Sequence, residues 1–323
     1  MRAIQITEAG GPDVLTPTEL PDPTAGPGQL LVEVAAAGVN FIDTYQREGI
    51  YPMQLPYVPG LEGAGRVRAV GDGVTEFAVG DRVAWADALG SYAELATVPA
   101  EKAIAVPDTV SDEDAAAALL QGLTAHCLVN DCYPVQQGDD VLVHAAAGGL
   151  GLQLTQLATA RGGRVIGTVS TEEKERLARE AGAADVIRYT EVDDLAAEVR
   201  GLTGGNGVAV AYDSVGATTF DASLASLRRR GMLVLCGAAS GPVPPVDPQR
   251  LNAAGSVYLT RPKMFDYVAS REELTARAAA VYAAVADGTL KVRIGQRHPL
   301  ADARTAHEEL QGRRTTGKVL LIP

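Results

Sequence analysis

Residues 141–160, VLVHAAAGGLGLQLTQLATA, pass from an apolar run through a glycine-rich turn into a segment with helical spacing. The apolar run predicts a buried strand and the segment after the turn predicts a helix. Ala146, Gly148 and Gly151 occupy the three glycine positions of the G-x-G-x-x-G pattern, with alanine at the first. Gly148 would admit a pyrophosphate close to the backbone, and Gly151 would let the helix pack closely on the strand. The amides and positive dipole at the helix N-terminus favour the same ligand, so the stretch predicts dinucleotide binding.

Strands and helices alternate around this stretch. A Ser cap at Ser111 and an acidic first turn predict a helix ahead of it. Strands that are apolar throughout and separated by amphipathic helices are typical of a parallel sheet covered on both faces. Right-handed crossovers then favour an α/β fold with a doubly wound sheet. The predicted strands cover 140–145, 164–169, 185–188, 208–213 and 231–236, and the predicted helices 149–161, 172–181, 192–202 and 218–228.

The first hundred residues have a different pattern, in which short alternating runs are broken by glycine and proline turns. This pattern predicts a compact all-β unit. Its strands are expected at Gln29–Ala35, Gly65–Val70 and Asp81–Trp85. The remainder of the chain, from about residue 255, holds a strand candidate at 256–260, a helix over about 271–287 and a final strand at 317–321.

Composition limits the class of protein. The 323 residues are 46% hydrophobic and 21% charged, which is a globular composition with room for about two domains. A net charge of −12 argues against nucleic acid or an anionic membrane as partner. We find no signal-like N-terminus and no run of about 18 apolar residues, so we expect a cytoplasmic protein. Three cysteines without metal-ligand spacing fit a reducing compartment.

The end of the second predicted strand indicates which dinucleotide binds. An NAD site has Asp or Glu there to accept hydrogen bonds from the ribose 2′-hydroxyl. This chain has Val169, Ser170 and Thr171 instead, with Lys174 one turn into the next helix. No carboxylate at the strand end would repel a 2′-phosphate, so the sequence favours NADPH. A solvated helix face is the alternative interpretation of Lys174.

Eight blocks in fixed order cover essentially the whole chain. They are AGVNFIDTYQREGIYP (37–52), VPGLEGAGRVRAVGDGV (58–74), GDRVAW (80–85), LLQGLTA (119–125), HAAAGGLG (144–151), YDSVG (212–216), LTRP (259–262) and GKVLLIP (317–323). Together they resemble the medium-chain dehydrogenase/reductase superfamily, specifically its zinc-free quinone oxidoreductase branch, which includes zeta-crystallin. The resemblance implies a GroES-like β-barrel catalytic domain split over 1–116 and 256–323. It also implies a Rossmann NADPH-binding domain over 117–255, an active-site cleft between the two domains and a homodimer.

The chain departs from the zinc alcohol dehydrogenases of the same superfamily. Where they have Cys, Gly-His-Glu and a second Cys, this chain has Asn40, Gly60-Leu61-Glu62 and Leu120. These residues lack the thiolate and imidazole ligands of a tetrahedral zinc site, so we expect no metal. Without a Lewis acid for an alcohol, the acceptor should already be electrophilic, such as a quinone or an alkene conjugated to a carbonyl.

The resemblance also implies the site residues. Four of them, Asn40, Asp43, Tyr45 and Tyr51, are expected to line the cleft, with Asn40 and Tyr45 close to the nicotinamide. Asp43 is equally an orienting or capping carboxylate, and the two tyrosines are alternatively interface packing. The cofactor-binding residues are expected to be Asn40, Tyr45, Thr124, Ala147, Gly148, Gly149, Leu150, Gly151, Ser170, Lys174, Tyr189, Ser214, Gly216, Cys236, Arg261 and Arg313.

Other conspicuous residues have structural interpretations. The four histidines show neither triad nor metal spacing, and His144, at the end of its strand, is expected to be a core or loop-ordering residue. The cysteines are expected in the core. The run from Arg228 to Arg230 is expected to be the solvated end of a helix.

The first functional hypothesis is NADPH-dependent, zinc-independent reduction of small quinones by hydride or by two single-electron equivalents. The second is NADPH-dependent reduction of enones or enoyl thioesters. A third is a binding or structural role, since members of this branch serve as lens crystallins and some bind RNA. The acidic balance argues against RNA, and the intact phosphate loop argues against a purely structural role.

Overall fold

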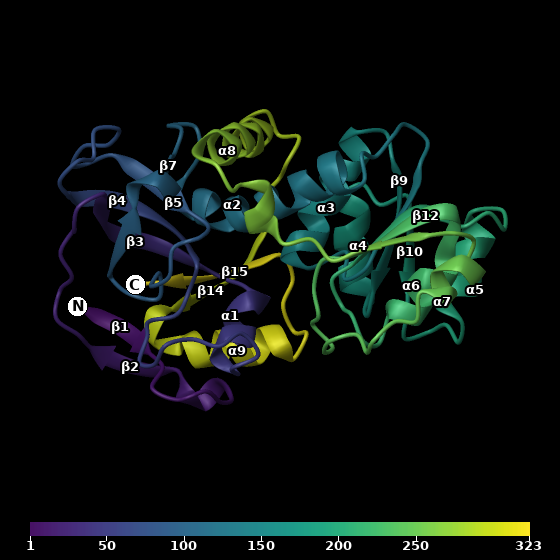
Figure 1. Ribbon diagram of the computed structural model, residues 1–323, viewed down its shortest axis with the longest axis horizontal. Coiled ribbons are helices and arrows are strands. Elements are labelled where there is room, and N and C mark those ends of the chain that lie inside the picture. Colours follow the sequence, from purple (N-terminus) through teal and green to yellow (C-terminus); the bar gives the residue numbers. More distant parts are fainter. The chain divides into compact units, whose positions relative to one another are not determined.

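A computed structural model describes all of residues 1–323, and the chain divides into two compact units (Figure 1). Unit 1 comprises 1–123, 268–288 and 292–323; unit 2 comprises 124–267 and 289–291. No helix combines the length and apolar character needed to cross a membrane. Each unit has its own sheet and core.

Unit 2 contains a six-stranded, wholly parallel sheet in the order β10-β9-β8-β11-β12-β13. This is the doubly wound order of a dinucleotide-binding sheet, with the first strand beside the fourth. The strands are β8 (Asp140–Val143), β9 (Arg164–Val169), β10 (Asp185–Arg188), β11 (Val208–Asp213), β12 (Leu227–Leu235) and β13 (Tyr258–Thr260). The helices are α3 (Gly149–Ala160), α4 (Glu172–Glu180), α5 (Leu195–Leu202), α6 (Phe220–Ser226) and α7 (Gln249–Ala253).

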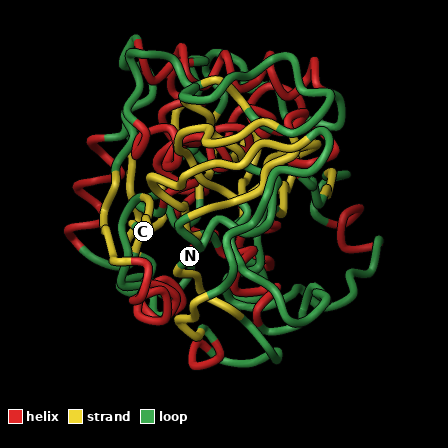
Figure 2. The backbone as a smooth tube through the Cα atoms, turned by 90° about the vertical axis from the view of Figure 1, so that its left-hand side faces the viewer, coloured by secondary structure: helices red, strands yellow, loops and turns green.

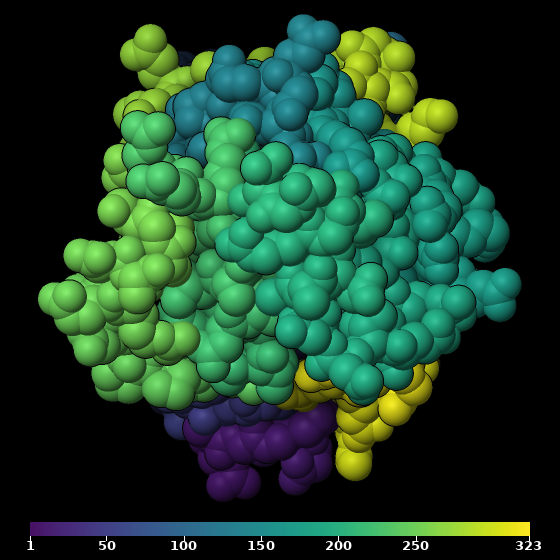
Figure 3. Space-filling view, turned by 90° about the vertical axis from the view of Figure 1, so that its right-hand side faces the viewer, coloured from purple at the N-terminus to yellow at the C-terminus, as the bar shows by residue number.

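Both faces of this sheet are buried, as the apolar strands predict. Val141 and Val143 of β8 belong to one hydrophobic cluster, whereas Leu142 between them belongs to another. Successive side chains of a strand point to opposite faces, so the two clusters lie on the two faces of the sheet. Residues of unit 2, coloured teal to light green, fill most of the surface seen in Figure 3.

Unit 1 is built on a seven-stranded sheet, β14-β15-β3-β4-β5-β7, with β6 also pairing with β3, and a separate pair β1-β2 (Figure 2). Its strands are β1 (Arg2–Gln5), β2 (Thr16–Glu19), β3 (Gln29–Val39), β4 (Glu62–Val70), β5 (Arg82–Trp85), β6 (Leu95–Pro99), β7 (Ile104–Ala105), β14 (Ile294–Pro299) and β15 (Lys318–Ile322). Its helices are α1 (Phe41–Arg47), α8 (Arg271–Ala286) and α9 (Ala303–Gln311), and α2 (Asp112–Cys127) begins in it.

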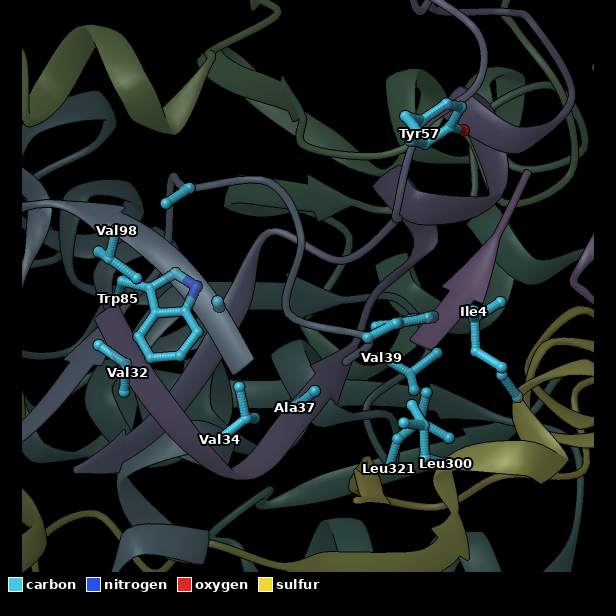
Figure 4. Packing of buried hydrophobic residues seen from close by; sticks show 14 of the residues in the cluster. Ile4, Val32, Val34, Ala37, Val39, Tyr57, Trp85, Val98, Leu300 and Leu321 are labelled. Atoms are coloured by element: carbon cyan, nitrogen blue, oxygen red, sulfur yellow. The ribbon is translucent and has the colours of Figure 1, made fainter. Parts of the chain in front are cut away.

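The core of unit 1 joins the first and last parts of the chain. Trp85 packs near Val32 and Val98, while Val39 lies near Leu321 (Figure 4). The final strand β15 pairs antiparallel with β3, so the C-terminal segment completes the sheet that the N-terminal segment begins. The α/β class and the two architectures expected from the sequence are confirmed.

Three local expectations were wrong. The N-terminal part is not all-β, because α1 follows the long strand β3. The strand at 258–260 pairs with β12 and therefore belongs to the parallel sheet, which moves the second unit boundary to Tyr267, beyond the expected residue 255. Arg228 to Arg230 lie in β12 and are exposed there, rather than ending a helix, because α6 stops at Ser226.

Candidate functional site

The glycine-rich loop of unit 2 has the predicted strand, turn and helix geometry. Strand β8 ends at Val143, and Gly148 is the N-cap of α3 with φ −76° and ψ 170°. A Cβ at Gly148 would meet only the Ala145 carbonyl oxygen, at 3.2 Å, whereas one at Gly151 would lie 2.2 Å from the same oxygen. Gly151 is thus required by the fold, while the space beside Gly148 suits a pyrophosphate held by helix N-terminal amides.

Most other predicted cofactor residues of unit 2 lie just beyond the carboxyl ends of adjacent strands. Ser170 follows β9, Ser214 follows β11 and Cys236 follows β12. Arg261 follows β13, and its Nη1 donates to the Leu235 carbonyl oxygen at 2.9 Å. Parallel strands end at one edge, so these residues share the edge at which α/β sheets bind ligands.

Two further residues belong to the same edge. The Tyr189 N–H, just after β10, donates to the Val169 carbonyl oxygen at 3.0 Å, which places Tyr189 beside the end of β9. Thr171 caps α4 by accepting a hydrogen bond from the Lys174 N–H at 3.3 Å. Thr124, by contrast, lies within α2 and not at the end of a strand.

A buried network that the sequence did not reveal stabilises this edge. Asp213, at the end of β11, accepts hydrogen bonds from the backbone N–H groups of Val215 and Gly216, each at 2.9 Å. The Ser223 hydroxyl donates to Asp213 Oδ2 at 2.7 Å, and His144 Nε2 lies 2.9 Å from the same hydroxyl. Asp213 therefore orders the loop that holds Ser214 and Gly216.

The hydrogen-bond directions in this network are opposite to those of a hydrolytic triad. The Ser223 hydroxyl donates its hydrogen bond to Asp213, so His144 Nε2 must donate to the Ser223 oxygen. His144 Nδ1 then accepts from the Thr168 hydroxyl, 2.9 Å away. Burial lowers the pKa of His144, which keeps the ring neutral. His144 is thus buried with both ring nitrogens hydrogen bonded, and the expectation of a core or loop-ordering residue is confirmed.

In unit 1 the predicted catalytic residues lie on one short segment. Asn40 is the N-cap of α1, and its backbone N–H donates to Asp43 Oδ2 at 2.8 Å. The capping role considered for Asp43 is therefore present. The rings of Tyr45 and Tyr51 meet edge to face with centroids 5.7 Å apart, and Tyr51 is 42% exposed.

The Asn40 side chain is bound by two buried charges. Its Nδ2 donates to Glu62 Oε2 at 2.9 Å and to the Gly38 carbonyl oxygen at 3.3 Å. Lys318 Nζ donates to Asn40 Oδ1 at 2.8 Å and to Glu62 Oε2 at 2.5 Å. Glu62 Oε1 accepts from the Leu120 N–H at 2.6 Å. Lys318 was missed because GKVLL in the sequence predicts only a strand.

A second buried network of hydrogen bonds starts at Asp43. The Tyr92 hydroxyl donates to Asp43 Oδ2 at 2.9 Å and lies 3.1 Å from His307 Nε2. Arg47 Nη1 lies 3.0 Å from His307 Nδ1, and since a guanidinium only donates, His307 must carry its proton on Nε2. Asp43 Oδ1 has no hydrogen-bond partner.

Burial shifts the pKa values of Asp43 and His307, the two titratable ends of this hydrogen-bond network, in opposite directions. It raises the pKa of Asp43 to about 7, against hydrogen bonds from Asn40 and Tyr92 that lower it. It lowers the pKa of His307 to about 3, helped by the charge of Arg47. In the folded state Asp43 is therefore mainly neutral below about pH 7, and His307 is mainly neutral above about pH 3.

These pKa shifts predict opposing pH dependences of unfolding. Folded Asp43 holds a proton that the unfolded chain releases above about pH 4, so its contribution to stability is full below pH 4 and lost as the pH rises to 7. His307 contributes stability above about pH 6.5 that is lost as the pH falls towards 3. Each group changes the free energy of unfolding by about 1.4 kcal/mol per pH unit. The two contributions have opposite signs, so they nearly cancel between about pH 4 and 6.5.

Single variants should expose each slope. Relative to wild type, we expect His307→Gln to gain unfolding free energy as the pH falls from 6.5 to 4, and Asp43→Asn to lose it over the same interval. Urea unfolding at several pH values measures both differences. Variants whose stability follows the wild-type pH profile would contradict the buried neutral forms.

Two models of protein families match the chain. The "Alcohol dehydrogenase GroES-like domain" matches residues 26–108, and "Zinc-binding dehydrogenase" matches residues 149–283. A quinone oxidoreductase of Salmonella typhimurium is 45% identical over 99% of each chain. The chain belongs to the quinone oxidoreductase branch of the medium-chain dehydrogenase/reductase superfamily. A 2-haloacrylate reductase of a Burkholderia species is 41% identical over 99% of this chain and 98% of its own.

The branch also includes solved structures. A mycobacterial protein in complex with NADPH superposes with a TM-score of 0.98, is 57% identical and is covered completely, as is this chain. The glycine loop and strand ends of unit 2 are the elements that would hold such a cofactor here.

The residues do not fit the zinc that one family description names. Asn40, Leu61 and Leu120 stand at the positions expected for ligands, and none offers a thiolate or imidazole. The neighbouring carboxylate, Glu62, is already bound to the Lys318 ammonium. These residues therefore do not form a zinc site.

Proposed function

We propose that this chain is an NADPH-dependent, zinc-independent oxidoreductase that reduces small quinones. The observation that carries the proposal is the glycine turn at Gly148, between the carboxyl end of β8 and the N-terminus of α3, in a chain similar to quinone oxidoreductases over its full length. NADPH, when bound, supplies the hydride. We assign the cofactor-binding role to the middle of the chain and the catalytic role to its N- and C-terminal parts.

The chain's own residues have separate tasks in this proposal. The amides of Gly149, Leu150 and Gly151 at the start of α3, with Ala147 and Gly148, bind the pyrophosphate. To the nicotinamide half we assign the residues beyond the strand ends, Ser214, Gly216, Cys236 and Arg261. To the adenosine 2′-phosphate we assign Ser170, Lys174 and Tyr189, with Arg313 and Thr124 as further contacts.

For the acceptor, we assign Tyr45 and Tyr51 as contacts of the substrate. Asn40 and Asp43 are buried polar residues of the same segment, and to Asn40 and Tyr45 we assign positions close to the nicotinamide. Both amide hydrogens of Asn40 are used inside the unit, the one to Gly38 at a long 3.3 Å, so Asn40 acts chiefly by position. Water is expected to protonate the released hydroquinone anion.

The test is NADPH oxidation with a p-quinone, an enone and an enoyl thioester side by side, with NADH controls. We expect fast turnover with the quinone. The second candidate, reduction of a conjugated double bond, is favoured by the similarity to a 2-haloacrylate reductase. Preference for either alkene would select that candidate, and no oxidation of NADPH with any acceptor would refute both.

A charge at the end of β9 should change the cofactor preference. Ser170→Asp places a carboxylate beside the expected 2′-phosphate, so we expect NADPH affinity to fall about 10-fold or more and NADH affinity to change little. Fluorescence titration with each nucleotide measures both, and Ser170→Asn is the matched neutral control. Equal losses for the two nucleotides would remove Ser170 from the 2′-phosphate site.

Two features of the assembled protein also belong to this proposal. We expect a homodimer that works in the cytoplasm and binds neither membrane nor nucleic acid. Light scattering of the purified protein measures its molar mass and so tests the expected homodimer.

A further inference from the structure

Lys318 is a fully buried lysine that the proposed reaction does not yet use. Its side chain is 1% exposed, and that of its partner Glu62 is 0% exposed. Gly38 leaves the space for this pair, because a Cβ there would lie 2.3 Å from Glu62 Oε2 and 2.8 Å from Lys318 Cε. Burying two charges carries a large desolvation cost, and replacing a buried ion pair with apolar residues of similar volume often leaves the protein equally stable. Stability alone therefore does not account for the pair.

The pair leaves Asn40 only one side-chain orientation. An ammonium has donors only, so Asn40 must turn Oδ1 to Lys318, at 2.8 Å. A carboxylate has acceptors only, so Asn40 must turn Nδ2 to Glu62, at 2.9 Å. A flipped amide would place its NH2 group against the ammonium and its oxygen against the carboxylate. Both contacts would become repulsive.

The pair also ties Asn40 to two distant parts of the chain. Asn40 is the N-cap of α1, Glu62 begins β4 and Lys318 begins β15. Glu62 holds the Leu120 N–H of α2 with its other oxygen, at 2.6 Å. The start of α1, which leads to Tyr45, is thus fixed against three other elements.

We propose that Lys318, paired with Glu62, is a positioning residue for hydride transfer that holds the Asn40 amide in a single orientation. The inference rests on the proposed function, because Asn40 is there taken to lie close to the nicotinamide. A displacement of a group near the reacting centre by about 1 Å costs on the order of 100-fold in rate, so a loosened Asn40 should slow the transfer.

The test uses a combined variant that leaves no unpaired charge. Lys318→Met with Glu62→Gln removes both charges, and the single oxygen of the glutamine can still accept from the Leu120 N–H while its NH2 group replaces Oε2 opposite Asn40. Hydride transfer is measured in a single turnover, by mixing the enzyme and NADPH with a p-quinone in a stopped-flow instrument. We expect the rate to fall about 10-fold or more, with the NADPH dissociation constant within about threefold of wild type.

A double-mutant cycle separates positioning from a merely structural role. If the pair acts through Asn40, the combined variant should slow Asn40→Ala by less than about threefold. Equal slowing in both backgrounds, or no slowing of the wild type, would overturn the proposal. Val98→Ala, in the core of the same unit, is the stability control and should lower the melting temperature without changing the rate per folded molecule.

A readout without turnover keeps this inference distinct from the proposed function. The two Asn40 amide protons, assigned by their loss in Asn40→Ala, should give separate, slowly exchanging NMR signals in wild type. In the combined variant we expect faster exchange and shifted signals. Unchanged signals would overturn the proposal even if the wild type proved inactive with quinones, an outcome that would refute only the proposed function.

Discussion

Replacing Gly148 with valine should abolish NADPH binding while leaving the protein folded. The φ and ψ of Gly148 suit any L-amino acid, and only the Ala145 carbonyl oxygen lies within 4 Å of the added Cβ. The Ala145 oxygen, at 3.2 Å, would have to move by a few tenths of an ångström, a far smaller change than a side chain at Gly151 would need, whereas a pyrophosphate would need the space. We expect the dissociation constant to rise at least about 100-fold, or about 2.7 kcal/mol, with Gly148→Ala intermediate. Fluorescence titration and circular dichroism measure binding and folding.

Gly151 provides the matched control three residues on. A Cβ there would lie 2.2 Å from the Ala145 oxygen and 2.8 Å from the Ala146 Cα, both backbone atoms. Gly151→Ala should therefore destabilise the fold, in contrast to Gly148→Val. Native binding by Gly148→Val would contradict the assignment of the loop.

The parts of the site that follow the chain locally could be predicted from the sequence. The glycine loop lies within a dozen residues, and the strand ends follow from alternating apolar strands and helices. Position at the carboxyl edge of the sheet then follows from parallel topology, without any side-chain detail. Ser170 was predicted in this way, whereas Arg261 came from the resemblance to the family, and the cofactor roles of both stay predictions.

The polar networks could not be predicted because their members are far apart in the chain. Lys318 and Glu62 are separated by 256 positions, and Tyr92 and His307 by 215. Lys318 lies in a segment whose pattern predicts only a strand, and no local pattern marks Glu62, Tyr92 or His307 as a member of these networks. A lysine in a final strand is ordinarily solvated, and only the sheet pairing of β15 with β3 brings Lys318 to Asn40. The capping box of Asp43, by contrast, is local and was considered.

Removing the Asp213 carboxylate should cause a large loss of stability in unit 2. Asp213→Ala leaves the Val215 and Gly216 N–H groups and the Ser223 hydroxyl without their buried acceptor. Each buried group left unpaired costs about 1–3 kcal/mol, so we expect a total of at least about 3 kcal/mol. This corresponds to a melting temperature lower by roughly 6–12 °C. NADPH affinity should fall too, because the loop holding Ser214 and Gly216 loses its anchor.

Asp213→Asn should be far milder, because the network can reverse. An asparagine can still accept from the loop N–H groups through its oxygen and donate from its amide to the Ser223 oxygen. Ser223 then donates to His144 Nε2, and His144 shifts its proton to Nδ1, facing Thr168. We expect a loss below about 1.5 kcal/mol and a change of His144 tautomer, visible in its ring ¹⁵N shifts. An asparagine variant as unstable as the alanine variant, or an unchanged tautomer, would contradict the hydrogen-bond directions assigned to the network.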